Sequence, residues 1–222
     1  SDVYKRQIYG DMDVNERLEY LDREYLSDFD VSDVDIHANI ERQAAFDKPV
    51  YETKPYAITE DESLEDNTYL SYNAVIGTSV DAKLYLAFQI LDYALVMTPG
   101  APVKQALLDA GISTDVYSSY ETSLYQPVYS IVAKNSNSKE QDRFVSVIND
   151  TLEKLVKDGI NERTIEAGIN YYEFKYREAD YGPYPKGLMY YLTMMDSWLY
   201  DETKPFIHIE AGDTFDELKK NA

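Results

Sequence analysis

Two β-rich runs lie next to each other in the middle of the chain, and they constrain the fold more than any other feature. The runs cover residues 115–122 and 124–134, and only a short polar link separates them. A link of this kind predicts an antiparallel hairpin, because parallel strands need a long crossover connection. Pro127 has no amide hydrogen to donate, which predicts that this part of the hairpin is an edge or a bulge. The hairpin excludes a purely parallel sheet.

Helical patterns flank this hairpin on both sides. Apolar residues recur at helical spacing, and glycine, proline or polar loops separate the segments. A further β-rich run, residues 69–77, precedes them and ends at Gly77. The resulting order of strand, helices, hairpin and helices predicts an α+β fold, an antiparallel sheet with helices packed on one face. The predicted helices are about 79–97, 102–110, 139–158, 161–179, 186–199 and one that starts near 214.

Local signals predict how some of these helices begin and which face they bury. Ser79 or Thr78 is expected to cap the first helix, and Ser138 with Gln141 is expected to form a capping box. Gly159 is a typical stop for the long helix before it. The helix at 186–199 has one apolar side, formed by Leu188, Leu192, Met195 and Leu199.

The N-terminal part has a different character. Residues 7–10 resemble the end of a strand, and Asp13 with Glu16 predicts a capped helix over 14–26. One strand and one helix cannot make a core, so we expect them to pack on something else. Residues 27–67 form an acidic connector with a short strand at 50–53. We therefore divide the chain into residues 1–46, the end of a preceding domain plus a linker, and residues 47–222, one α/β domain.

The composition restricts the kinds of partner that the chain can bind. The net charge of −20 disfavours nucleic acid, whose phosphates such a surface repels. The acid excess either keeps the protein soluble by self-repulsion or faces a cavity that attracts basic ligands, and the sequence leaves both open. The chain has no cysteine, which excludes disulfides and thiol catalysis and fits a reducing compartment such as the cytoplasm. The mean hydropathy is −0.48 and polar residues interrupt the apolar runs, so we expect no membrane partner.

The residues that carry hydrolytic chemistry are scarce. A zinc hydrolase needs two close ligands on one helical face and a carboxylate beside the metal-bound water. His37 and His208 are the two histidines, and neither belongs to an H-E-x-x-H or H-x-x-E-H motif. His208 and Glu210 are expected on one strand face without a third ligand, so His208 is interpreted as structural. No nucleophile elbow or phosphate loop is present, and the sequence predicts neither a catalytic residue nor a metal site.

A segment that mixes aromatic and charged residues, 170–181, stands out near the end of a predicted helix. Its tyrosines suit a half-buried helix that keeps their hydroxyls in water. Tyrosine and arginine are also frequent anchors at interfaces. On this second interpretation Arg177, Tyr181 and Tyr184 line a surface that contacts a peptide. The abundance of tyrosine, 22 residues in the chain, leaves the two interpretations open.

Several longer motifs occur in an order that resembles one family, the pitrilysin (insulinase-type) zinc metallopeptidases in their presequence-protease branch. The resemblance runs from Ile8 to the C-terminus and leaves out residues 1–7. The motifs that carry it are Gly10-Asp11-Met12-Asp13, Tyr69-Leu70-Ser71-Tyr72-Asn73, Leu91-Asp92-Tyr93-Ala94-Leu95, Pro99-Gly100-Ala101-Pro102, 105–112, Tyr125-Gln126-Pro127-Val128, 166–173, Tyr184-Pro185-Lys186-Gly187-Leu188 and Asp196-Ser197-Trp198-Leu199-Tyr200.

The resemblance implies a division of labour. In the family two bowl-shaped halves enclose a peptide chamber, and the zinc motif lies in the first domain of the first half. This chain is similar to the second, non-catalytic domain of that half, preceded by the end of the catalytic domain in residues 1–46. None of the zinc ligands has a counterpart here, so no cofactor is expected in this chain and zinc is expected in the catalytic domain of the parent protein.

The partners implied are that catalytic domain, the second half of the peptidase, and unfolded peptides as substrates. In the family the second half supplies an arginine and a tyrosine to the site, and the resemblance implies by internal pseudo-symmetry a loosely analogous place for Arg177 and Tyr184. An alternative is a stand-alone inactive relative that pairs with an active subunit. The start of the chain inside an expected strand favours the domain of a longer protein.

Overall fold

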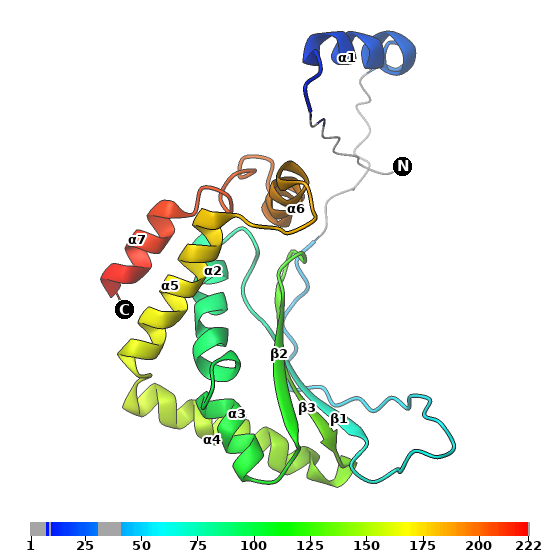
Figure 1. Cartoon of the computed structure of the whole chain (residues 1–222). Coiled ribbons are helices and arrows are strands. Elements are labelled where there is room, and N and C mark those ends of the chain that lie inside the picture. The colour runs from blue at the N-terminus through cyan, green and yellow to red at the C-terminus, as the bar shows by residue number, and fades with distance from the viewer. Residues whose placement is uncertain (1–7, 9, 31–40, 222) are drawn as a thin grey trace.

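The computed structural model describes residues 8, 10–30 and 41–221, and Figure 1 shows its arrangement. A three-stranded sheet consists of β1 (Thr68–Val75), β2 (Asp115–Glu121) and β3 (Val128–Ser136). The helices are α1 (Val14–Leu21), α2 (Ala82–Asp92), α3 (Pro102–Asp109), α4 (Gln141–Asp158), α5 (Glu162–Glu178), α6 (Lys186–Trp198) and α7 (Gly212–Asn221), with π-helical turns Asp22–Leu26 and Tyr93–Met97 after α1 and α2. The predicted α+β class is confirmed. Of the strand end expected at 7–10, residues 7 and 9 lie outside the described residues, and residues 8 and 10 are not in a strand.

The sheet has the order β1-β3-β2, and both pairings are antiparallel. The predicted hairpin of β2 and β3 is therefore confirmed. The expectation that Pro127 marks an edge or a bulge is wrong, since β3 is the central strand. Pro127 lies one residue before β3, where no ladder amide is needed, and its carbonyl accepts a hydrogen bond from the Ile76 amide at 2.8 Å.

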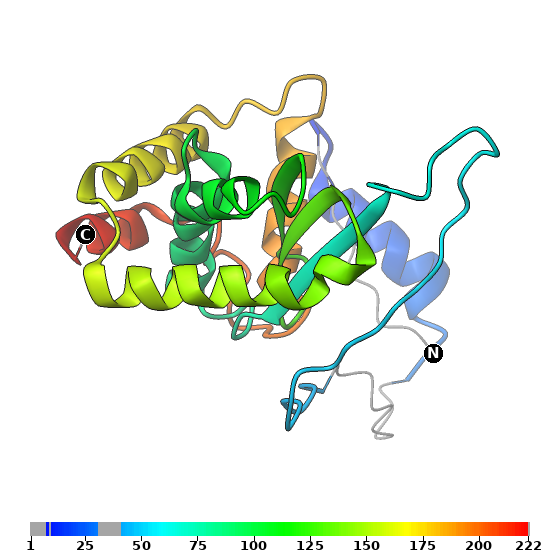
Figure 2. The same ribbon diagram turned by 90° about the horizontal axis from the view of Figure 1, so that it is seen from below.

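Helices α2, α3 and α4 pack on one face of the sheet, and α5 and α7 lie on the same side beyond α2, as Figures 1 and 2 show together. Alternate residues of each strand point toward these helices, following the two-residue period of a strand. The sheet, α3 and α4 meet in one continuous core, in which Phe144 of α4 is 1% exposed. The buried residues of this core are Leu70, Leu95, Val96, Val103, Leu107, Ile112, Val116, Tyr129, Ile131, Ala133, Phe144 and Ile148.

A second, smaller core ties α2 to α5 and α7. Its buried residues are Leu86, Ile90, Ile169, Ala211 and Phe215. Gly168 lies where α2 and α5 approach, and a Cβ there would come within 3.2 Å of the Ile90 side chain. A side chain at this position would crowd Ile90 and Tyr93, so the close contact of the two helices favours glycine.

The stretch Ala82–Asp109 has the length and apolar character of a membrane span, contrary to what its interrupting polar residues suggested. In the structure it is divided into α2, a π-helical turn and α3, with a break at 98–101. Val96, Val103 and Leu107 from this stretch are at most 1% exposed and belong to the core. The apolar character of this stretch is accounted for by packing against the sheet.

Two predicted helix caps are wrong. The N-cap of α2 is Asp81, whose carboxylate accepts from the Leu84 amide at 3.0 Å, while Ser79 is fully buried upstream. Ser138 forms no capping box, because residues 138–140 make a 3-10 turn and Glu140 takes the N-cap position of α4. The Gly159 stop of α4 is confirmed, with φ +84°.

The connector 41–67 crosses the side of the sheet that the helices leave open (Figure 2). Gln43 and Gln126 exchange two hydrogen bonds, of 2.7 and 3.1 Å, at the end of the β2–β3 hairpin. Asp66 and Asn137 exchange two more at the opposite end. The strand predicted at 50–53 is wrong, since this segment has no regular structure and leaves its apolar side chains exposed.

The first and sixth helices are poorly covered. The Asp13 cap of α1 is confirmed by bonds from the Asn15 and Glu16 amides, but no residue of α1 is buried. The apolar side predicted for α6 is only partly covered: Leu188, Leu192 and the C-cap residue Leu199 are 44–51% exposed. The buried residue of α6 is Ser197, half a turn away from that side.

Candidate functional site

The metal-ligand geometry of a zinc hydrolase is not found in residues 8, 10–30 and 41–221. No group of three or more His, Cys, Asp or Glu side chains in this part of the chain is placed to hold a metal ion. His37 lies outside the described residues. The residues that the structure describes therefore do not fit a catalytic zinc.

His208 is a buried packing residue, 7% exposed. Its ring stacks on Tyr85 with centroids 3.9 Å apart, and its Nε2 lies 2.7 Å from the carbonyl oxygen of Ser79. Since a carbonyl only accepts, Nε2 carries the proton. Burial lowers the pKa of His208, which keeps the ring neutral. The expectation that His208 and Glu210 lie on one strand face is wrong, because both residues lie in the turns and bends before α7.

Asp196 of α6 stands at the centre of a polar cluster beside His208. Tyr85 of α2 donates to Asp196 Oδ2 at 2.8 Å, and Thr122 at the end of β2 donates to the same oxygen at 3.3 Å. Burial raises the pKa of Asp196 and, together with the charge of Asp196, that of Tyr85. The cluster joins α6, α2 and the sheet, and its groups are engaged with one another.

Sequence reasoning did not identify this cluster. One signal was available: Asp196 is the only acidic residue in α6, and Lys186 is the only other charged one. A lone carboxylate in such a helix needs a hydrogen-bonding partner if it is buried. The partners Tyr85 and Thr122 lie 111 and 74 residues away in the chain, so the sequence alone could not supply them.

The predicted substrate-lining residues lie in the last turn of α5 and the loop that follows. Arg177 is exposed and bonded to Glu173 through Nε and an Nη at 3.1 and 2.8 Å. Tyr181 packs edge-on against Tyr190 of α6, with ring centroids 6.0 Å apart. Tyr184 is 62% exposed. The structure thus places the two tyrosines in one turn, where the Tyr184 amide bonds to the Tyr181 carbonyl at 3.2 Å, and leaves Tyr184 accessible.

The lysine and arginine near this turn are held by one carboxylate. Glu173 accepts a hydrogen bond of 2.6 Å from Lys219 at Oε2, and it accepts the bonds from Arg177 at Oε1. These bonds, that from Lys219 first, lower the pKa of Glu173. Arg177 uses two of its five N–H donors in this way, so its fork can still bind a further acceptor.

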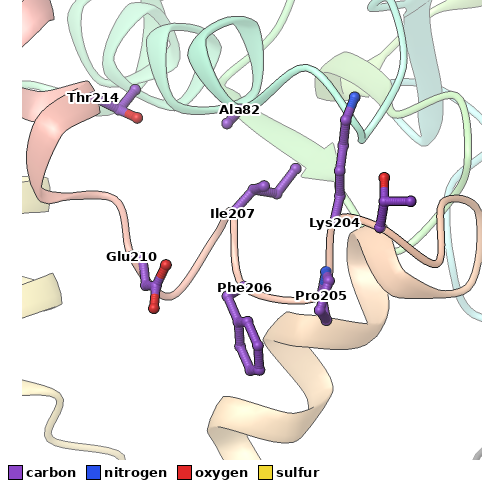
Figure 3. A pocket seen from close by; sticks show the side chains of 8 residues that line it. Ala82, Lys204, Pro205, Phe206, Ile207, Glu210 and Thr214 are labelled. Atoms are coloured by element: carbon purple, nitrogen blue, oxygen red, sulfur yellow. The ribbon is translucent and has the colours of Figure 1, made fainter.

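A shallow pocket of about 350 Å³ lies elsewhere, between the first turn of α2 and the segment that precedes α7 (Figure 3). Its lining combines apolar side chains with one lysine and one glutamate. None of the predicted site residues belongs to it. The lining residues are Ala82, Thr203, Lys204, Pro205, Phe206, Ile207, Glu210 and Thr214.

Comparison with protein families matches residues 7–172 to the Peptidase M16 inactive domain. The protein HypA of Clostridium perfringens is 40% identical over 212 residues, which are 96% of this chain and 22% of that protein. Presequence protease 1 of Arabidopsis thaliana, chloroplastic/mitochondrial, is 31% identical over 214 residues, 96% of this chain and 20% of that protein. The chain thus spans about a fifth of the length of these relatives.

A solved structure supports the fold. The inactive peptidase domain of a proposed zinc protease from Bordetella parapertussis superposes with a TM-score of 0.52. It covers 68% of this chain and 82% of its own, at 13% sequence identity. At 13% sequence identity the similarity shows that this chain and the solved domain share a fold, and it shows nothing about their ligands.

Proposed function

This chain belongs to the Peptidase M16 inactive domain family, and from that premise we propose that it is the non-catalytic domain of a zinc-dependent oligopeptidase, forms part of the chamber that degrades unfolded peptides, and supports the catalytic domain. The observation that carries the proposal is the 31% identity, over 96% of the chain, to a presequence protease five times as long. In this arrangement the metal and the activated water belong to another part of the parent protein.

The charge of the chain supports a role toward basic peptides. A net charge of −20 gives a field that attracts positively charged, unfolded chains. Tyr184, exposed beside the end of α5, offers a flat amphipathic surface to such a peptide. Arg177 adds N–H donors for peptide carbonyl groups.

The first test concerns metal and activity. We expect the purified chain to retain no stoichiometric zinc after dialysis against chelator and zinc repletion, and to leave an unfolded basic peptide intact. Metal analysis by mass spectrometry and chromatography of the peptide give the two readouts. One tightly bound zinc per chain, or chelator-sensitive cleavage, would overturn the proposal.

The second test concerns peptide contact. Titration of a fluorescent, arginine-rich unfolded peptide should show weak binding that fades with salt, because the Debye length shrinks from about 10 Å at 0.1 M to about 3 Å at 1 M. Tyr184→Ala should weaken it by about 1 kcal/mol, roughly fivefold. Tyr51→Ala is the matched control, since Tyr51 is 63% exposed on the connector. Equal losses in both variants would remove Tyr184 from the binding surface.

A further inference from the structure

The pocket of Figure 3 has fixed walls. Most of its lining comes from residues 203–210, in the segment before α7. Hydrogen bonds from two other helices hold this segment in place. Ser197 of α6 donates to the Lys204 carbonyl at 2.6 Å, and Tyr176 of α5 donates to the Ile209 carbonyl at 2.9 Å. The pocket is therefore part of the folded body.

Two side chains of this segment are left available to a ligand. The Glu210 amide bonds to the Phe206 carbonyl at 2.9 Å, a helical turn that places the two side chains on one side. Figure 3 shows them next to each other along the segment. Phe206 is 48% exposed. Among the described residues, the Glu210 carboxylate has neither a hydrogen-bond donor nor an ion-pair partner.

The lysine in the pocket does not neutralise this carboxylate. The Lys204 ammonium group donates to the Val80 carbonyl at 3.4 Å and lies 3.5 Å from a carboxylate oxygen of Asp201. Figure 3 shows the Lys204 side chain pointing away from Glu210. The charge of Lys204 is thus paired and that of Glu210 is not, so the pocket favours a cation.

The shape and the walls of the pocket select among cations. Its volume of about 350 Å³ is enough for one side chain or a small molecule. A guanidinium group is planar, stacks on aromatic rings and binds carboxylates with two parallel hydrogen bonds, whereas an ammonium group is a strongly hydrated point charge. The Phe206 ring and the Glu210 carboxylate offer both contacts that a guanidinium uses. Pro205 and Ile207 can cover the methylene groups of its stem.

From these observations we propose that the pocket binds an arginine side chain of an unfolded peptide. The inference rests on the proposed function in one respect, namely that the ligand belongs to a peptide. The net charge of −20 draws such a cationic chain to the protein, and the pocket then distinguishes arginine from other residues.

Nuclear magnetic resonance of the ¹⁵N-labelled full chain tests this pocket. Three capped glycine-serine peptides carry one arginine, one lysine or one citrulline, which has the shape of arginine without its charge. We expect the arginine peptide to shift the amide signals of Thr203, Phe206, Ile207 and Glu210. It should bind about fivefold more tightly than the citrulline peptide, with the lysine peptide between them.

Two variants separate the contacts. Glu210→Gln should abolish the preference for arginine over citrulline. Its matched control is Glu166→Gln, which removes the same charge from an exposed position of α5 outside the pocket and should keep the preference. Phe206→Leu keeps an apolar wall without the ring, and should lower the affinity for the arginine peptide to that for the lysine peptide. All three side chains are exposed, and the spectrum of each variant verifies its fold.

Several outcomes would overturn the proposal. They are equal affinities for the arginine and citrulline peptides, equal affinities for the arginine and lysine peptides, and signal shifts that lie only outside the pocket. Equal effects of Glu210→Gln and Glu166→Gln would do so as well. Such a failure is distinguishable from failure of the proposed function, which depends on the zinc assay and on Tyr184.

Discussion

Replacing Phe144 with alanine is expected to lower the free energy of unfolding by about 3–5 kcal/mol. Phe144 is 1% exposed and lies in the core that joins α4 to α3 and the sheet. Truncation removes the ring from a close-packed interior and leaves a cavity that the surrounding strands cannot fill. Guanidinium unfolding followed by circular dichroism measures the change as a shift of the midpoint at constant slope.

The same helix supplies the control for this prediction. Val156 of α4 is 88% exposed, so Val156→Ala removes no buried surface. Alanine also has the higher helix propensity, by up to about 0.7 kcal/mol. We expect this variant to be unchanged or slightly more stable. A loss of comparable size in both variants would mean that α4 does not pack through Phe144.

The second large effect concerns a buried carboxylate in the same core. Asp92 and Tyr129 are 6% and 5% exposed, and the Tyr129 hydroxyl donates to Asp92 Oδ1 at 2.8 Å. Burial raises the pKa of Asp92, and the hydroxyl groups of Ser118 and Tyr129 oppose the rise. Tyr129→Phe removes this donor and should cost about 1–3 kcal/mol at neutral pH, the penalty of an unsatisfied buried acceptor.

The pH dependence of this variant has a definite sign. A carboxyl whose pKa is raised in the folded state contributes stability below its unfolded pKa, about 3.9, and loses it as pH rises through the folded pKa. Loss of the Tyr129 hydroxyl raises the folded pKa of Asp92 further. The destabilisation by Tyr129→Phe should therefore be larger at pH 7.5 than at pH 5, as measured by chemical unfolding at both values.

Tyr120 is the matched control for Tyr129. Its hydroxyl is buried and has no hydrogen-bond partner among the described residues. Tyr120→Phe removes an unsatisfied polar atom and should be neutral or stabilising at both pH values. If Tyr120→Phe costs as much as Tyr129→Phe, the Asp92 hydrogen bond is not the source of the loss.

The sequence predicted the elements of this fold well where local signals and tertiary packing agree. The hairpin, the strand at 68–75 and the helices from 102 to 178 follow from periodicity and from stops such as Gly159. The N-cap of α2 was predicted at Ser79 because serine is a common capping residue. Ser79 is instead buried, and Asp81 is the N-cap. The strand at 50–53 was wrong because β-propensity describes a fit to a neighbouring strand, and none pairs with it in the described structure.

The apolar stripe predicted on one side of α6 illustrates the limit in a different way. Its pattern correctly predicted an amphipathic helix, but a pattern cannot say which side faces the body. The orientation is set by partners far away in the chain: Asp196, beside the stripe, accepts bonds from Tyr85 and Thr122, and Ser197, opposite the stripe, donates to the Lys204 carbonyl. For the candidate site, sequence reasoning named Arg177, Tyr181 and Tyr184, and the accessibility of Tyr184 could be known only from the loop that presents it.

Within residues 8, 10–30 and 41–221 the order β1-β3-β2 leaves β1 and β2 as outer strands of the sheet. An outer strand offers backbone donors and acceptors on one side, and in a crowded solution such groups recruit strands from other copies. Asp115 and Glu121 lie at the two ends of β2, where charged side chains disfavour pairing with a strand of another molecule. Outer strands that nothing covers can pair with strands of other copies and start a fibre. The net charge of −20 makes the copies repel one another and so opposes this association.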